Sequence, residues 1–218
     1  MKIFKSVFNK ASGFFLTHWH RFVFVVFVVL IIVFTFLILI IGINLSKRQV
    51  TSKTVVESEV LRDKALRNKL SEWVYNHSKK ISRGQAKFIV TEAMKTDKAL
   101  LIIALAEYES VGFVPTVVSK KGCVGLMQIN FNGNNGKDVN GKTLVQAGII
   151  NEKRDLFEVD RNIRSGDFLL GVYLKQSKGN VLKALDRYLG ERDGVYVLEV
   201  FSNLAELYLL QEAVVKSM

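Results

Sequence analysis

Apolar residues change their spacing twice along this chain. The run from Phe22 to Ile43 contains no charged side chain, and it is long enough to cross a bilayer, which requires about 20 apolar residues. Residues 44–80 are charged and carry an approximate helical stripe of apolar positions at Val56, Val60, Leu66, Leu70, Trp73 and Val74. From residue 81 to residue 218, segments with helical apolar spacing alternate with loops, which predicts a mainly α domain.

Capping signals place the first helices of this domain. Ser82 is followed three residues later by a glutamine, which is the spacing of a capping box, so a helix begins there and runs through Met94. Thr96 is the expected N-cap of the next helix, which ends at Glu109. Residues 111–125 contain the only proline, Pro115, and the glycines at 112 and 122, which favour a loop.

The rest of the domain is predicted from similar signals. Residues 131–142 are rich in asparagine and glycine and form a loop or a short hairpin, which either contacts sugar through its amides or is a plain surface loop. Helices are expected over residues 161–176 and from Tyr196 to Leu210, and Asn180 is the expected cap of the helix between them.

The helix that ends near residue 110 is apolar on nearly every side, which is typical of a helix in the middle of a domain. Glu107 and Glu109 lie at its end. An ionised carboxylate is costly there unless it is paired, or unless its pKa rises until it holds a proton, as a general acid must. At about 100° per residue the two side chains point about 200° apart, so both cannot serve one cleft, and periodicity does not choose between them.

The residues after this helix resemble the signature of the soluble lytic transglycosylase family, whose members cut peptidoglycan on a lysozyme-like helical fold. The similarity covers residues 81–200 and rests on Glu109-Ser110, Phe113, Pro115, Ser119 and Gly125-Leu126-Met127-Gln128. The segment 155–160, followed by Asn162-Ile163 and Gly166, resembles the family's entry into its next helix, and Tyr188 matches the third family motif. That motif departs from the family pattern because Arg187 replaces its alanine and its asparagine is missing, and the loop after the glutamate is one residue longer.

This resemblance implies that Glu109, rather than Glu107, is catalytic and that it acts twice. It would protonate the glycosidic oxygen between N-acetylmuramic acid and N-acetylglucosamine and then accept the proton of the muramic C6 hydroxyl. The product would be a 1,6-anhydro sugar, so the reaction would be that of a lyase. The acetamido group of the substrate would replace the second carboxylate of ordinary glycosidases. Glu107 would be a structural partner of a cation or of loop amides, and no cofactor is expected.

The resemblance also implies the substrate-binding residues. Ser119 and Gln128 would hydrogen-bond the acid or the acetamido groups. Met127 and Tyr188 would supply walls of the cleft, and Gly125 would permit a close approach of the backbone. The acids in the segment 155–160 are expected to interact favourably with the helix dipole at a helix start. If the reaction is a hydrolysis, a second carboxylate should be sought among these acids.

The net charge of +11 is concentrated near the N-terminus. Residues 1–80 carry 13 Lys and Arg against 4 Asp and Glu, whereas residues 81–218 carry 18 against 16. The domain is therefore nearly neutral, which disfavours nucleic-acid binding because that function requires a basic face. The single cysteine, Cys123, allows no intramolecular disulfide, and all three histidines precede the predicted domain, so no metal site is expected.

The segment 22–43 is predicted to be a retained transmembrane signal anchor, because a cleaved signal peptide has a shorter apolar core and a small-x-small cleavage site. The basic residues 1–21 favour a cytoplasmic N-terminus, although basic residues between positions 47 and 53 compete with them. Since peptidoglycan lies outside the inner membrane, we expect a single-pass inner-membrane protein whose domain, residues 81–218, is periplasmic. The lipid bilayer and glycan strands are its expected partners.

Two questions stay open at the level of the sequence. Residues 44–80 form either a stalk or partner-binding helix, or a solvated helix that caps the catalytic domain. The function is that of a lytic transglycosylase, of a lysozyme-type muramidase that uses water on the same fold, or of a catalytically weak glycan-binding protein. Any of these could serve a secretion, conjugation or phage machine at the cell wall.

Overall fold

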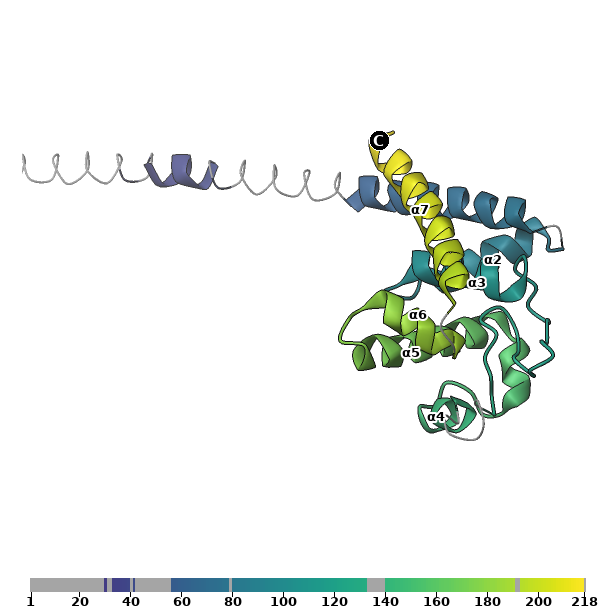
Figure 1. The fold of residues 1–218 in the computed structure, drawn as a ribbon. Coiled ribbons are helices and arrows are strands. Elements are labelled where there is room, and N and C mark those ends of the chain that lie inside the picture. Colours follow the sequence, from purple (N-terminus) through teal and green to yellow (C-terminus); the bar gives the residue numbers. More distant parts are fainter. Residues whose placement is uncertain are drawn as a thin grey trace, which may run out of the picture. The chain divides into compact units, whose positions relative to one another are not determined.

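The computed structural model describes residues 30, 33–39, 41, 56–78, 80–132, 140–190 and 193–217 (Figure 1). The chain divides into two compact units, Met1–Glu59 and Val60–Met218. The described part of the second unit consists of helices joined by loops, and its isolated β-bridges all lie within residues 118–129. The expected mainly α class is therefore confirmed.

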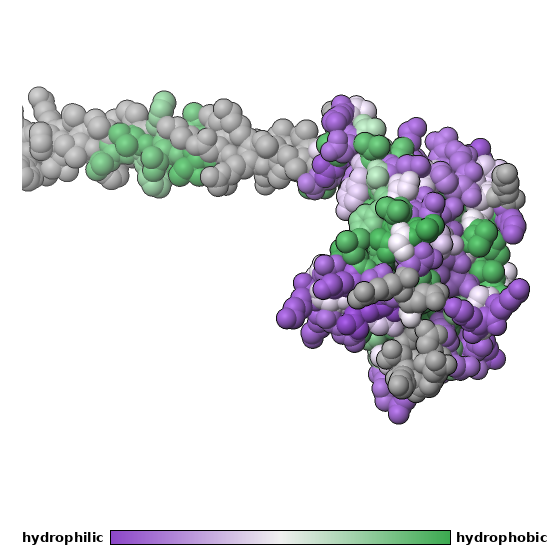
Figure 2. Space-filling model, in the orientation of Figure 1, coloured by the Kyte–Doolittle hydropathy of each residue, from purple (hydrophilic) through white to green (hydrophobic). Residues whose placement is uncertain are grey.

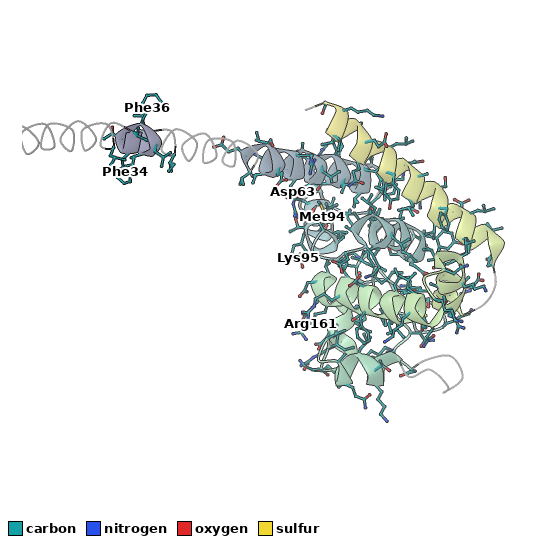
Figure 3. The ribbon with its side chains drawn as sticks, turned by 90° about the vertical axis from the view of Figure 1, so that its left-hand side faces the viewer. Phe34, Phe36, Asp63, Met94, Lys95 and Arg161 are labelled. Carbon is teal, nitrogen blue, oxygen red and sulfur yellow. The ribbon has the colours of Figure 1, made fainter. Side chains whose placement is uncertain are left out.

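In the first unit, residues 33–39 are helical, and their apolar side chains are exposed. Phe34 and Phe36 point outward from this segment (Figure 3), and Figure 2 shows an apolar surface along it. Among the described residues, no helix is long and apolar enough to cross a membrane. Most of the predicted anchor, residues 22–43, and all of the predicted N-terminal segment, residues 1–21, lie outside the described residues.

Residues 56–77 form a helix whose two ends differ in burial. The side chains of residues 56–64 are exposed, whereas Leu70 and Val74 are fully buried and Trp73 is almost so. These three side chains belong to the hydrophobic core of the second unit. The C-terminal end of this helix therefore packs on the domain, as in the second interpretation of residues 44–80, a helix that caps the catalytic domain.

Helix α2 (Arg83–Ala93) begins at the predicted capping box. The backbone N–H of Gln85 donates to the Ser82 hydroxyl at 3.2 Å, and the Ser82 N–H donates to the Gln85 side chain at 2.9 Å. The helix ends at Ala93 with Met94 as its C-cap, one residue before the predicted end, and Met94 and Lys95 mark this end in Figure 3. Its inner face contributes Ala86, Ile89 and Val90 to the core.

The prediction that Thr96 caps the next helix is wrong. The Thr96 hydroxyl donates to the Ala93 carbonyl at 2.9 Å, so it closes the end of α2 instead. Helix α3 (Ala99–Ser110) begins after Lys98, whose side chain makes no capping hydrogen bond. The Lys98 ammonium pairs with Asp167 at 2.8 Å and thereby links the start of α3 to α5 (Val159–Gln176).

Helix α3 is the central element of the second unit. All side chains from Ile102 to Ala106 are buried, and the helix contacts α2, α5 and α7 (Gly194–Lys216). Neighbours on several sides explain why its sequence is apolar in nearly every direction. Its last turn carries Glu107 and Glu109.

The remaining helices follow the predicted order. Helix α4 (Asn140–Gln146) begins inside the expected loop at 131–142, most of which lies outside the described residues. The short helix η1 (Lys153–Phe157) leads into α5 (Val159–Gln176), which contains the predicted helix 161–176.

Helices α6 (Val181–Leu189) and α7 (Gly194–Lys216) complete the unit. The predicted cap of α6 is confirmed, because the Asn180 side chain accepts from the Lys183 N–H at 3.0 Å. Helix α7 contains the predicted closing helix and extends beyond it at both ends. It packs along α3, while α6 packs mainly on α5 (Figure 1).

Candidate active site

Glu109 lies in the last turn of α3 and receives a hydrogen bond from α7. The Tyr196 hydroxyl, which is completely buried, donates to Glu109 Oε1 at 2.8 Å. Burial of the carboxyl raises the pKa of Glu109 to about 7, and the bond from Tyr196 opposes part of this shift. At neutral pH the group is therefore protonated in roughly half of the molecules, which suits both proton donation and proton acceptance.

Glu107 has a different partner from the one expected. The side-chain amide of Asn203 donates to Glu107 Oε2 at 2.7 Å, so the carboxylate has a side-chain amide of α7 as a partner among the described residues. Asn203 and Tyr196 are seven residues apart on α7, which places them on the same side of that helix. The two glutamates thus both reach α7, although they leave α3 in different directions.

Tyrosine rings gather around Glu109. Tyr108 contacts Tyr196 edge to face, with 5.0 Å between ring centroids, and Tyr173 contacts Tyr188 in the same way at 6.1 Å. Burial is the main cause of the raised pKa of Tyr108, Tyr188 and Tyr196, and the negative charge of Glu109 raises all three further. The structure therefore brings Tyr188, which the sequence singled out, near the acid.

Tyr188 also contacts the Gly125–Gln128 turn. Its hydroxyl donates to the Met127 carbonyl at 2.7 Å. The Met127 side chain is fully buried, and a Cβ on Gly166 would lie only 2.6 Å from it. Met127 is therefore a core side chain in this structure and not a wall of an open cleft, because α5 covers it through Gly166.

Ser119 and Gln128 direct their polar groups at their own loop. The Ser119 hydroxyl accepts from the Cys123 N–H at 3.1 Å, within a turn that the Ser119 and Cys123 backbones also close. The Gln128 amide donates to the Gly125 carbonyl at 2.9 Å. These side chains fix the shape of the loop that follows α3, because these hydrogen bonds join atoms of that same loop.

Asn162 of α5 is the polar centre of this region, and sequence reasoning gave it no role. Its Oδ1 accepts from the Met127 N–H at 2.8 Å, and its Nδ2 donates to the carbonyls of Val124 at 3.0 Å and Leu156 at 2.7 Å. Asn162 is 1% exposed, and a buried amide with three partners is strongly constrained. The sequence signal that could have indicated this role is an asparagine beside Ile163, on the inward side of a predicted helix.

Gly125 allows this asparagine to reach the loop. Gly125 has a φ of +78°, and a Cβ built on it would lie 2.2 Å from Asn162 Nδ2 and 2.7 Å from the Leu156 carbonyl oxygen. The expected close approach at Gly125 is thus present, but in this structure the approaching group is a side chain of α5.

Two of the three acids of the segment 155–160, Asp155 and Glu158, have partners in the structure. Asp155 accepts from the Asn151 N–H and from Arg161, both at 2.7 Å, and the Asn151 bond is the largest cause that holds the pKa of Asp155 below its usual range. Arg161, labelled in Figure 3, also pairs with Glu158 at 2.9 Å. These acids stabilise the entry into α5, as expected from their position at a helix start.

Comparisons with known proteins agree with this arrangement. No curated protein and no solved structure matches the chain. Residues 87–190 match the family model described as the transglycosylase SLT domain. That range includes Glu109, the Gly125–Gln128 turn and Tyr188, and it ends before Tyr196. Residues 87–190 of this chain therefore belong to the transglycosylase SLT domain family, whose lysozyme-like members cleave peptidoglycan.

Proposed function

We propose that this protein is a peptidoglycan lytic transglycosylase and that Glu109 is its single acid and base. The observation that carries the proposal is the environment of this carboxyl group. The group is mostly buried, accepts a hydrogen bond from the neutral Tyr196 hydroxyl and has a pKa of about 7. A residue that must give a proton and then take one works best when its pKa lies near the operating pH. Family membership of residues 87–190 supports the same substrate.

The proposed reaction needs no other protein carboxylate. Protonated Glu109 donates its proton to the oxygen of the β-1,4 bond between N-acetylmuramic acid and N-acetylglucosamine, and the C1–O bond breaks. The substrate's acetamido group stabilises the positive charge at C1. Ionised Glu109 then accepts the C6 hydroxyl proton as O6 bonds to C1, so the residue ends in its starting state and a 1,6-anhydro ring has formed.

Two observations favour ring closure over attack by water. Asp155 and Glu158, which lie in the segment where a second carboxylate was sought, are bound to Arg161, and Asp155 also to backbone amides. The C6 hydroxyl is tethered to the reacting sugar, which makes its attack effectively unimolecular. An inverting or retaining hydrolase would need a second carboxylate at a defined distance from the first.

In the proposed enzyme, a loop binds the sugar. Its shape depends on four residues, which are Ser119, Gly125, Gln128 and Tyr188. Tyr188 lies near the acid and holds the Met127 carbonyl. Ser119 and Gln128 keep the loop backbone in place, and we propose that this loop contacts the acetamido groups of the substrate. Met127 supports this loop from inside the core.

Digestion of purified peptidoglycan should release muropeptides that end in 1,6-anhydro-N-acetylmuramic acid. Each should be lighter by one water than the corresponding product of a muramidase digest of the same material, and mass spectrometry decides between them. Products with reducing ends would identify a hydrolase. A zymogram without clearing would instead indicate a glycan-binding protein.

We also propose that residues 22–43 anchor the protein in the inner membrane and that the catalytic domain is periplasmic. The support is the uncharged run in the sequence and the external location of the substrate. The full-length protein should sediment with membranes and resist extraction by high salt, which screens electrostatic binding. Activity of a C-terminal reporter of the kind that works only in the cytoplasm would overturn this topology. We also propose that the protein serves a secretion, conjugation or phage machine at the cell wall.

A further inference from the structure

The catalytic helix ends in an unusual cap directly after Glu109. The Gly112 N–H donates to the Glu107 carbonyl at 3.2 Å, and the Val111 N–H donates to the Tyr108 carbonyl at 3.4 Å. This pair of bonds is the Schellman motif, in which the residue after the helix adopts a left-handed conformation. Glu109 lies one residue before the end of the helix at Ser110, so the cap fixes the turn that carries the acid.

The cap contains residues that disfavour its conformation. Val111, Gly112 and Phe113 have φ values of +49°, +90° and +60°. Glycine is the usual residue at the left-handed position of this motif, whereas a β-branched residue rarely adopts it. Val111 is 76% exposed, so packing of its own side chain does not compensate for the strain. Strained backbone of this kind persists only when surrounding contacts hold it.

The contacts that hold the cap come from the end of helix 56–77. The Ser78 hydroxyl donates to the Gly112 carbonyl across 34 residues of sequence, and Ser78 is 5% exposed. Phe113 is completely buried, with its ring edge to face against Trp73 at 6.1 Å between centroids. The Trp73 indole in turn donates to Glu206 of α7 at 3.0 Å. Trp73 of helix 56–77 therefore holds the cap by an aromatic contact, and Ser78, directly after this helix, holds it by a hydrogen bond.

We propose that the end of helix 56–77 is a positioning element of the active site, in which Ser78 and Trp73 hold the strained cap and thereby fix the orientation of Glu109. The proposal rests on the proposed function of Glu109 as the acid. Ser78 and Trp73 precede the family match at residues 87–190, so the catalytic unit of this chain includes a segment before its recognised domain. Both residues act through the backbone of the cap and do not touch substrate.

Ser78→Ala tests this inference in the full-length protein purified in detergent. The substitution removes the only hydroxyl that binds the Gly112 carbonyl in the described residues, and Ser78→Thr restores a hydroxyl. We expect Ser78→Ala to lower kcat about tenfold with KM changed by less than about twofold, because misplacement of an acid affects the chemical step. Ser78→Thr should recover most of kcat.

Ser71→Ala is the matched control. The Ser71 hydroxyl donates to the Arg67 carbonyl at 2.6 Å on the same helix and contacts no part of the cap. Its loss should leave kcat and KM unchanged. Equal losses in Ser71→Ala and Ser78→Ala, or an unchanged kcat in Ser78→Ala, would overturn the inference, because the helix would then act only through general stability.

The pKa of Glu109, followed by carbon-13 NMR of its carboxyl group, gives a readout that does not depend on catalysis. If the cap loosens, water reaches the carboxyl, and the pKa should fall from about 7 by about one unit in Ser78→Ala but not in Ser71→Ala. Should the unaltered protein fail to cleave peptidoglycan, the proposed function fails. The titration then decides alone: a shifted pKa supports the positioning role, and an unshifted one overturns it.

Discussion

Glu109→Gln is expected to abolish peptidoglycan cleavage while the fold is retained. Glutamine has nearly the same size and can still accept the hydrogen bond from Tyr196, but it has no acidic proton to give. Loss of a general acid and base lowers rates by about 10²- to 10⁴-fold. We therefore expect kcat/KM to fall by at least about 10²-fold, measured as release of soluble fragments from labelled peptidoglycan. In the unaltered protein, kcat/KM should be constant below pH 7 and decline above it.

The same substitution should change the pH dependence of stability. The Glu109 pKa is about 7 in the folded protein against an ordinary value of 4.5, so the folded state retains a proton that the unfolded chain releases. Its contribution to stability is present below pH 4.5 and is lost as the pH rises to about 7. Relative to the unaltered protein, Glu109→Gln should gain roughly 2–3 kcal/mol between pH 4 and pH 8 in urea unfolding.

Glu107→Gln is the matched control, because it makes the same chemical change two residues away in the same helix. A glutamine can still accept from Asn203, so we expect a loss of stability below about 1.5 kcal/mol and nearly full activity. An inactive Glu107→Gln variant beside an active Glu109→Gln variant would reverse the assignment. A stability difference that does not change with pH would instead contradict the burial of the Glu109 carboxyl.

Gly125→Ala is expected to be the most destabilising small substitution at the site. The new Cβ would lie 2.2 Å from Asn162 Nδ2 and 2.7 Å from the Leu156 carbonyl oxygen. The asparagine cannot move away without breaking its bonds to Met127, Val124 and Leu156, which are all buried residues. The clash and the left-handed backbone together should cost roughly 3–5 kcal/mol, measured as the free energy of unfolding in urea.

Gly122→Ala separates the clash from the backbone strain. Gly122 lies in the same loop with a φ of +80°, but nothing lies within 4 Å of the position of its Cβ. The substitution should therefore cost only the strain, about 1 kcal/mol. Equal costs at the two glycines would show that Asn162 does not hold the loop in the way described.

Local signals predicted the helices well because these signals involve residues a few positions apart. The Ser82 capping box, the Asn180 cap and the apolar spacing of α5 all act within one or two helical turns. Thr96 shows where local reasoning failed, since its hydroxyl can serve either the end of one helix or the start of the next. The structure uses it for the end of α2, because α3 begins three residues later.

Sequence also singled out Glu109, but it could not predict what surrounds this residue. Tyr196 is 87 residues away from Glu109, and the Asn162 bonds to Val124 and Met127 span 38 and 35 residues. None of these partners follows a local pattern, because a hydrogen bond across the core depends on how helices pack. The burial of Met127 beneath Gly166 has the same origin.

The sequence by itself determined the order of helices, the caps of α2 and α6 and the choice of one glutamate through its neighbouring motif. Only the tertiary structure decided that this glutamate meets a buried tyrosine and that its pKa rises to about 7. It also decided that the end of helix 56–77 holds the cap after the acid. The physical reason is that burial and long-range hydrogen bonds are set by the packing of α3 among its neighbours, which no short stretch of sequence specifies.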